Sequence, residues 1–465
     1  MPAKLQSTLI FHGGAGSVTG ANFLLTIEPA TESGRLIRVL VDCGLYQGGK
    51  VFEDKNREPF PYDPAAIDYL LVTHAHLDHV GRIPSLIRAG FRGTIYSTPP
   101  TKEIAALILE DSLGVMEKEV RGSGQPLLYE SADVTAALAR WRTVDYRASF
   151  TLDNSGVTVT LRDAGHILGS AMFEIARGAR RLLFTGDLGN SPSPLLHNTE
   201  LVKDINYLVM ESVYGDREHE NIERRRDRLE DVIENTMRQD GVLLIPAFSI
   251  ERTQELLYEI EHMTAEGRIP PVPVYLDSPL AIKVTEIYKR FHSYLNSQVS
   301  DPNHLRDGVF NFPNLHKTLS TEESRAIAGF PGRKIIIAGS GMSNGGRIIH
   351  HEKRHLGNPS TTLLLIGYQA AGSLGRRLEE GAKEVTILGT RVAVRAKVVS
   401  LSGYSAHRDG PGLLEFVHQL SESLEFVYAA MGEPKSALFL VQRVRDYLGI
   451  RAIAPQVGQS ATLDL

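Results

Sequence analysis

The sequence has a single cysteine, Cys43, among its 465 residues. One cysteine excludes an intrachain disulfide and a zinc site built from several cysteines. No uninterrupted apolar run approaches the ~20 residues that a membrane helix requires. The N-terminal residues 1–8 lack the apolar core of a signal peptide. We therefore expect a cytoplasmic protein without a membrane partner.

An excess of positive charge is also missing. The formal net charge is −5, from 50 basic and 55 acidic side chains. Nucleic-acid-binding domains are often strongly basic, so binding of this kind would rely on a local patch and on the charge of bound metal ions. The hydrophobic content of 42% is ordinary for a globular protein. The length allows two or more domains of ~100–200 residues each.

The most informative segment is residues 73–79, which read THAHLDH. It contains His74, His76, Asp78 and His79, and it follows a short aliphatic run that predicts a buried strand. Imidazole and carboxylate are suitable ligands for Zn²⁺, and a metal ion that activates water at neutral pH is typical of a hydrolase. A solvated, histidine-rich loop is the alternative interpretation. Open α/β sheets place their sites at the carboxyl ends of strands, where this segment is predicted to lie.

Four further segments have the same layout, in which an apolar run leads to a ligand-type residue: Asp42, His166, Asp187 and His407. Each signal is weak alone. A lone histidine is more often a core or surface residue, and an aspartate after a strand usually forms a turn or caps a helix. Their succession along the same chain as the histidine cluster favours one shared site.

With these segments, the sequence resembles the metallo-β-lactamase-fold nucleases of the β-CASP group, which include the cleavage-and-polyadenylation endonuclease. The resemblance covers nearly the whole chain. The superfamily motifs fall on Asp42, on residues 74–79, on His166 and on Asp187. The acidic motif of the β-CASP group falls on Glu211, and its last histidine motif falls on His407. Segments 13–20, 42–48, 277–281, 339–342 and 367–369 also match.

The resemblance implies a site for two Zn²⁺ ions with a shared hydroxide as the nucleophile. One ion would be held by His74, His76 and His166, the other by Asp78, His79 and His407, with Asp187 as the bridge. Two close metal ions suit phosphodiester hydrolysis, because they stabilise the attacking and leaving oxygens and lower the pKa of the water.

Asp42 and Glu211 would be the outer carboxylates that hold the ligands in place. A surface or helix-capping carboxylate is the alternative for Glu211. We expect the catalytic residues to be Asp78, Asp187, Glu211 and His407.

The implied architecture is α/β, with a four-layer αββα metallo-β-lactamase fold that contains an inserted domain. The ligands Asp42 to Asp187 lie in the first two-fifths of the chain and His407 lies near its end, so the intervening stretch is predicted to be an insertion. Alternating strand and helix patterns predict a three-layer parallel α/β domain there, the β-CASP domain. We place the boundaries at 1–214, 215–382 and 383–465.

Five residues of the insertion are candidates for binding RNA. Ser340 and Gly341 lie in a Gly/Ser turn before a helix, which can present N–H groups to a phosphate or be merely a tight connection. Arg252 begins a helix and could contact a phosphate or form an ion pair. Arg377 stands where many relatives have a histidine that acts as an acid; arginine is a poor proton donor but binds phosphate well. His351 could supply the proton, although a surface or core role is the commoner one.

The sequence therefore predicts a zinc-dependent ribonuclease, mainly endonucleolytic, that acts on single-stranded RNA and leaves 5′-phosphate and 3′-hydroxyl ends. A small-molecule ester or thioester hydrolase of the same fold is one alternative, and the insertion, Glu211 and His407 argue against it. A non-catalytic RNA-binding scaffold is another, and the presence of every proposed ligand argues against that. DNA is a third option, although DNA-repair members commonly have valine where His407 stands. The oligomeric state stays open, a homodimer included.

Overall fold

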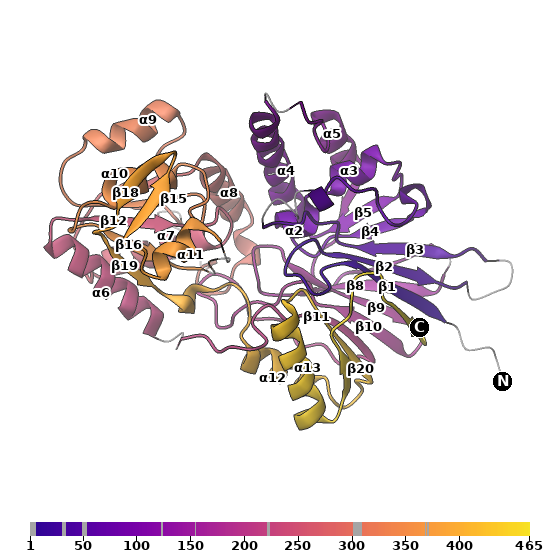
Figure 1. The fold of residues 1–465 in the computed structure, drawn as a ribbon. Helices are drawn as coiled ribbons and strands as arrows, with labels where there is room; N and C mark the ends of the chain where they lie inside the picture. The colour runs from indigo at the N-terminus through magenta and orange to yellow at the C-terminus, as the bar shows by residue number, and fades with distance from the viewer. Residues whose placement is uncertain are drawn as a thin grey trace. The chain divides into compact units, whose positions relative to one another are not determined.

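The computed structural model describes residues 6–29, 34–48, 54–121, 124–153, 155–220, 224–300, 309–367, 369 and 372–465. The chain divides into two units. Figure 1 shows the ribbon coloured by residue number. Unit 1 consists of Met1–Ser191, Asn198–Glu218 and His407–Leu465. Unit 2 consists of Pro192–His197 and His219–Ala406.

Unit 1 contains two seven-stranded sheets. The first has, in spatial order, β22 (Ser460–Leu463), β1 (Ser7–Gly13), β2 (Asn22–Ile27), β3 (Ile37–Val41), β4 (Tyr69–Leu71), β5 (Thr94–Ser97) and β6 (Trp141–Thr143). The second has β21 (Arg451–Ile453), β20 (Phe426–Ala430), β11 (Tyr207–Glu211), β10 (Arg180–Phe184), β9 (Ala171–Arg177), β8 (Val157–Asp163) and β7 (Ser149–Thr151).

The inner faces of these two sheets pack against each other. Leu25 and Val39 of the first sheet belong to the same buried cluster as Phe173, Phe184 and Tyr428 of the second. Strand β1 alternates buried and half-buried residues, as a strand with one face on a core does. The core of unit 1 is therefore the space between the sheets.

Helices cover the outer faces of both sheets (Figure 1). The second sheet packs against α12 (Gly410–Gln419) and α13 (Pro434–Leu448), whose apolar faces form a buried cluster with it. The helices α3 (Ile83–Arg88), α4 (Pro99–Val120) and α5 (Ser131–Ala139) lie beside the first. Unit 1 thus has the four αββα layers that the sequence predicted.

Unit 2 is built on one six-stranded parallel sheet. Its spatial order is β14 (Leu315–Lys317), β13 (Val274–Asp277), β15 (Lys334–Ala338), β12 (Val242–Pro246), β16 (Thr362–Leu365) and β19 (Lys397–Ser400). The helices are α6 (Arg225–Arg238), α7 (Arg252–Ala265), α8 (Pro279–Arg290), α9 (Thr321–Ala326), α10 (Ile348–His355) and α11 (Leu374–Glu379). A separate hairpin joins β17 (Glu384–Ile387) to β18 (Thr390–Ala393).

Both faces of the central strands of unit 2 are buried. Every residue of β12 and of β15 is buried, which explains why these strands read as continuous apolar runs rather than as alternating patterns. Helices α10 and α11 pack on the face that carries Leu244, Ile336 and Leu363. The predicted three-layer parallel α/β domain is confirmed.

By packing, the chain passes from unit 1 to unit 2 after Ser191 and after Glu218, and it returns to unit 1 after His197 and after Ala406. Strand β19 pairs with β16 and so extends the sheet of unit 2. Among the described residues, no helix is both long enough and apolar enough to cross a membrane.

Candidate metal centre

The segment 73–79 is presented by strand β4 and by the single helical turn α2 (Leu77–Val80). The turn is held against the loop after β3, since Cys43 N donates to His79 O and Leu45 N donates to Leu77 O. Gly44 is required there, because a Cβ at this position would lie 1.6 Å from Asp78 O. Close backbone packing therefore fixes where Asp78 and His79 point.

Four of the predicted ligands converge on one point. The ligand atoms of His74, His76, His166 and Asp187 all lie within 4.8 Å of one another. His76 Nδ1 lies 3.0 Å from His74 Nε2 and 3.3 Å from His166 Nε2. Asp187 Oδ2 lies 3.4 Å from His74 Nε2 and 3.5 Å from His166 Nε2. Three imidazoles and a carboxylate in this arrangement match the donors of a four-coordinate zinc site.

The remaining predicted ligands also lie around the Asp187 carboxylate, His79 at Oδ1 and His407 at the oxygen that faces His74 and His166. Asp187 Oδ1 lies 3.5 Å from His79 Nε2, which is 3.9 Å from Asp78 Oδ2. Asp187 Oδ2 lies 3.8 Å from His407 Nδ1. Asp187 therefore stands between the two ligand sets, as a bridging carboxylate would.

Two buried atoms of this second set indicate a cation. Neither His79 Nε2 nor Asp187 Oδ1 has a hydrogen-bond partner within the described part of the chain. A buried polar atom without a partner is costly. Burial lowers the pKa of His74 well below its usual range. The donor set and the orphaned atoms both fit metal binding.

Asp42 contacts His79 at Nδ1, the ring nitrogen opposite the one that faces Asp187. The Asp42 carboxylate accepts hydrogen bonds from Thr73 N and from Thr73 Oγ1, both at 2.8 Å, and its Oδ2 lies 2.7 Å from His79 Nδ1. With Nδ1 donating to this carboxylate, His79 Nε2 is the atom that faces Asp187. Burial disfavours the charged ring, but Asp187 and Asp42 outweigh it and raise the pKa of His79.

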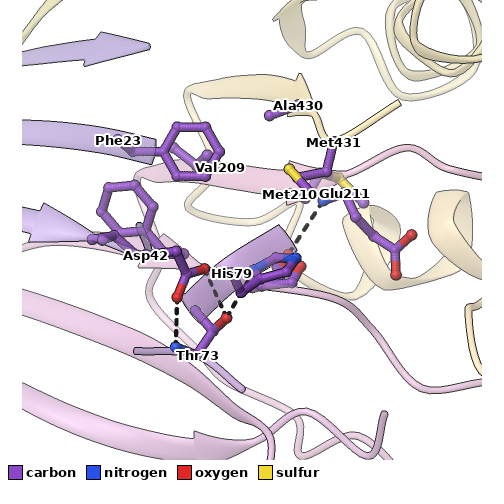
Figure 2. A pocket seen from close by; sticks show the side chains of 13 residues that line it. Phe23, Asp42, Thr73, His79, Val209, Met210, Glu211, Ala430 and Met431 are labelled. Carbon is purple, nitrogen blue, oxygen red and sulfur yellow. Dashed lines mark hydrogen bonds and ion pairs between the residues drawn. The ribbon is translucent and has the colours of Figure 1, made fainter. Parts of the chain in front are cut away.

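These outer contacts lie in a small cavity (Figure 2). The figure shows Asp42, Thr73 and His79 joined by dashed lines, with Phe23 and Met431 among the other lining side chains. Thr73 was not among the residues predicted for the site. Its signal in the sequence is its position directly before His74, which places its backbone at the end of the strand.

Glu211 connects two of the ligand segments. It lies at the end of β11, and its Oε1 accepts a hydrogen bond of 2.6 Å from Leu188 N, next to Asp187. His407 Nδ1 lies 3.3 Å from the same carboxylate. Burial raises the pKa of Glu211. For His407, burial is outweighed by Glu211 and Asp187, which raise its pKa to about 9.

The candidate RNA-binding residues lie in unit 2. Ser340 and Gly341 follow β15 in a tight loop. Within it, Ser340 N donates to Gly345 O, and Ser340 Oγ accepts from Asn344 N. Gly341 packs against Phe248, so closely that a Cβ would lie 2.7 Å from its ring. Of the matching segment 367–369, Tyr368 lies outside the described residues.

Two further candidates are held by other side chains. The buried guanidinium of Arg252 binds the carboxylate of Glu255 and the carbonyl of Tyr404. His351 Nε2 lies 2.7 Å from Asp277 Oδ2.

Arg377 differs from these two, because its exposed side chain forms no ion pair with any residue that the structure describes. Of these three residues, it is the exposed one, whereas Arg252 and His351 are buried.

Three domain families match the sequence. Residues 33–213 match the metallo-beta-lactamase superfamily domain, and residues 253–378 match the Beta-Casp domain. Residues 391–455 match the Zn-dependent metallo-hydrolase RNA specificity domain. These matches fall in the order that the predicted architecture requires.

The chain is also similar to curated proteins. It is 38% identical to Ribonuclease TTHA0252 of Thermus thermophilus over 412 residues, which cover 88% of this chain and 90% of the relative. It is 32% identical to Transcription termination factor FttA of Methanosarcina mazei over 464 residues, 95% of this chain and 69% of the relative. A crystal structure of a protein of unknown function from Enterococcus faecalis shares the fold, with a TM-score of 0.56 at 13% identity, over 98% of this chain and 100% of the other.

The αββα sandwich with converging histidines and aspartates defines a metallo-hydrolase. The chain belongs to the β-CASP family of metallo-β-lactamase-fold nucleases. The family resemblance seen in the sequence is thereby confirmed.

Proposed function

We propose that the protein is a zinc-dependent ribonuclease that hydrolyses RNA phosphodiester bonds, mainly at internal positions. The observation that carries this proposal is the place of Asp187 between two sets of ligand atoms. The match to an RNA specificity domain and the similarity to a named ribonuclease support RNA as the substrate.

We assign His74, His76 and His166 to one zinc ion and Asp78, His79 and His407 to a second, with Asp187 shared. When bound, two zinc ions would acidify the attacking water and neutralise charge on the phosphate. Asp42 keeps His79 Nε2 aimed at Asp187 through the contact at Nδ1. Glu211 accepts a hydrogen bond from Leu188 N, next to Asp187, and also lies against His407 Nδ1. It therefore fixes the position of the His407 ring relative to the Asp187 segment.

The proposed substrate contacts in unit 2 differ in how far each side chain is already bonded within the protein. Arg377 is exposed and carries no ion pair among the described residues, so it is free to bind a phosphate of single-stranded RNA. The turn that contains Ser340 and Gly341 is bonded to the start of α11, the helix of Arg377, because Leu374 N donates to Asn344 Oδ1 and Gly375 N donates to Met342 O. Its backbone groups are further candidates for a phosphate contact, although Ser340 N is used within the turn. The guanidinium of Arg252 already donates hydrogen bonds to the Glu255 carboxylate and to Tyr404 O, which favours the ion-pair alternative for this residue.

His351 could release a proton only from Nδ1, because Asp277 holds Nε2. We also propose a cytoplasmic location and a homodimer. Sedimentation velocity measures the assembly state directly.

The proposal is tested with RNA labelled at both ends and incubated with zinc-loaded protein. Endonucleolytic hydrolysis yields internal cuts from the first time points, and the new fragments carry 5′-phosphates. Asp187→Asn is the matched control, since it keeps the side-chain shape but removes the shared charge. Release of single nucleotides from one end would instead show an exonuclease. Binding without cleavage would favour the scaffold, and faster turnover of model thioesters than of RNA would favour the small-molecule hydrolase.

A further inference from the structure

Arg408, directly after His407, bonds to the loop that carries Asp187. Its backbone N donates to Leu188 O at 2.9 Å, and its side-chain Nε donates to Gly189 O at 3.2 Å. Gly189 and His407 also form an isolated β-bridge. The residue thus holds the segment of His407 and the segment of Asp187 together through both its main chain and its side chain.

The other end of the same guanidinium reaches a third ligand segment. Arg408 Nη2 donates to Thr199 Oγ1 at 3.0 Å, and that hydroxyl donates to Ala164 O, also at 3.0 Å. Ala164 lies two residues before His166. One guanidinium therefore connects, directly or through a single hydroxyl, the segments of His407, Asp187 and His166.

These segments have no room to rearrange around a shorter side chain. Gly189 N donates to Ala164 O at 2.9 Å, and a Cβ at Gly189 would lie 1.8 Å from Gly165 O. The backbone of the two loops is thus in direct contact. Without the Arg408 guanidinium, Gly189 O would lose the hydrogen bond that Nε donates, and the close backbone contact leaves no room for a neighbouring group to replace it.

Packing fixes the direction of the Arg408 side chain. Its guanidinium lies over the ring of Phe416 on α12, 5.8 Å from the ring centroid. Asp409, the next residue, caps α12 by accepting from Gly412 N at 2.9 Å. The planar fork of arginine serves two acceptors in fixed directions, which a lysine ammonium on a flexible stem does not reproduce.

We propose that Arg408 is a positioning residue that sets the spacing of His407 from Asp187 and His166. This inference rests on the proposed ligand set. Arg408 itself touches neither the reacting atoms nor a ligand side chain; it acts through the backbone of the ligand segments. Its loss should weaken the zinc ion that His407 helps to hold more than the ion held by His74, His76 and His166.

The test uses Arg408→Met, which keeps the stem over Phe416 and removes the guanidinium. Zinc affinity is measured by competition with a chromophoric chelator, and kcat and KM are measured on one short RNA. We expect the weaker zinc site to lose affinity by ~10–100-fold, as when outer partners of metal ligands are removed. We expect kcat to fall at saturating RNA with KM within about twofold of the original, because no RNA contact is lost. Arg408→Lys should not restore either value.

Arg445→Met is the matched control, because Arg445 of α13 also donates from Nε to a backbone carbonyl, Ala452 O at 2.8 Å, in the same unit. It should leave zinc affinity unchanged. Thr199→Val removes only the linking hydroxyl and should reduce the affinity for the same zinc ion by a smaller factor. If Arg408→Met does not fold, this variant tests the proposal in its place.

Wild-type zinc affinity and kcat in Arg408→Met, or in Thr199→Val where Arg408→Met does not fold, would overturn the inference. Equal loss of zinc in the Arg445 control would also overturn it, because that result indicates general destabilisation. If the unaltered protein binds no zinc at all, the proposed function fails, whatever the variants do.

Discussion

Asp42 Oδ2 and His79 Nδ1 lie 2.7 Å apart, with both side chains buried. The same carboxylate also accepts two hydrogen bonds from Thr73, near the start of the loop that follows β4. Asp42 therefore fixes both the ring of His79 and the backbone that leads to the histidine cluster.

Asp42→Asn should weaken zinc binding, because the amide cannot accept from all three donors. We expect a ~10–100-fold loss of affinity, the usual cost of removing an outer partner of a metal ligand. Chelator competition measures it. Asp63→Asn, at the cap of the 3₁₀ turn Pro64–Ala66, is the matched control and should keep full affinity. Undiminished affinity in Asp42→Asn would mean that His79 needs no such support.

His407→Ala should reduce RNA cleavage by orders of magnitude while leaving the fold intact. The ligand set around His74, His76 and His166 does not include this residue, so one zinc ion should remain. Circular dichroism checks the fold and elemental analysis checks the metal. Near-normal cleavage with both ions present would remove His407 from the site.

Arg377→Lys should mainly raise KM, because lysine keeps the charge but loses the fork that binds two phosphate oxygens. The basic limb of the pH–rate profile should not move, since arginine transfers no proton in the accessible range. Kinetics on one short RNA from pH 6 to 10 measure both. Arg376→Lys is the neighbouring control, because Arg376 is paired with Glu380 at 2.7 Å. A shifted basic limb would show that Arg377 tunes or replaces the acid.

Glu352→Gln should flatten the pH dependence of stability. Burial raises the pKa of Glu352 to about 8, and Ser343 Oγ donates to its Oε1 at 2.5 Å. Between the ordinary carboxyl value and pH 8, the folded protein keeps a proton that the unfolded chain has lost. The free energy of unfolding therefore falls as pH rises through this window, by up to about 1.4 kcal/mol per pH unit.

Glutamine keeps the acceptor for Ser343 and has no proton to lose. Urea unfolding at several values from pH 5 to 8 compares the two proteins. Equal slopes in both would show that Glu352 ionises normally in the folded state.

The candidate ligands could be proposed from the sequence because several of them follow local apolar runs, and the resemblance to the β-CASP group supplied their division between two metal ions. His74, His166 and Asp187 each follow a strand, and an apolar run is visible without knowledge of the fold. The order of αββα sandwich and inserted parallel sheet followed from the same motifs.

Contacts between distant segments left no such pattern. Arg408 and Thr199 are separated by 209 residues, and nothing near either one signals the other. Arg252 gives a second example: an arginine at a helix start fits a phosphate contact or an ion pair, and only the fold brings Tyr404 O to its guanidinium. The place of β19 in the sheet of unit 2 likewise depends on its pairing with β16, a contact that the sequence near either strand does not signal.

The central claim is that seven side chains hold two zinc ions with Asp187 shared between them. Elemental analysis of purified protein and of Asp187→Ala, each dialysed against the same zinc buffer, tests it most directly. The account predicts two zinc ions per chain in the unaltered protein and loss of metal together with RNA cleavage in the variant. Two full equivalents of zinc in Asp187→Ala would contradict it.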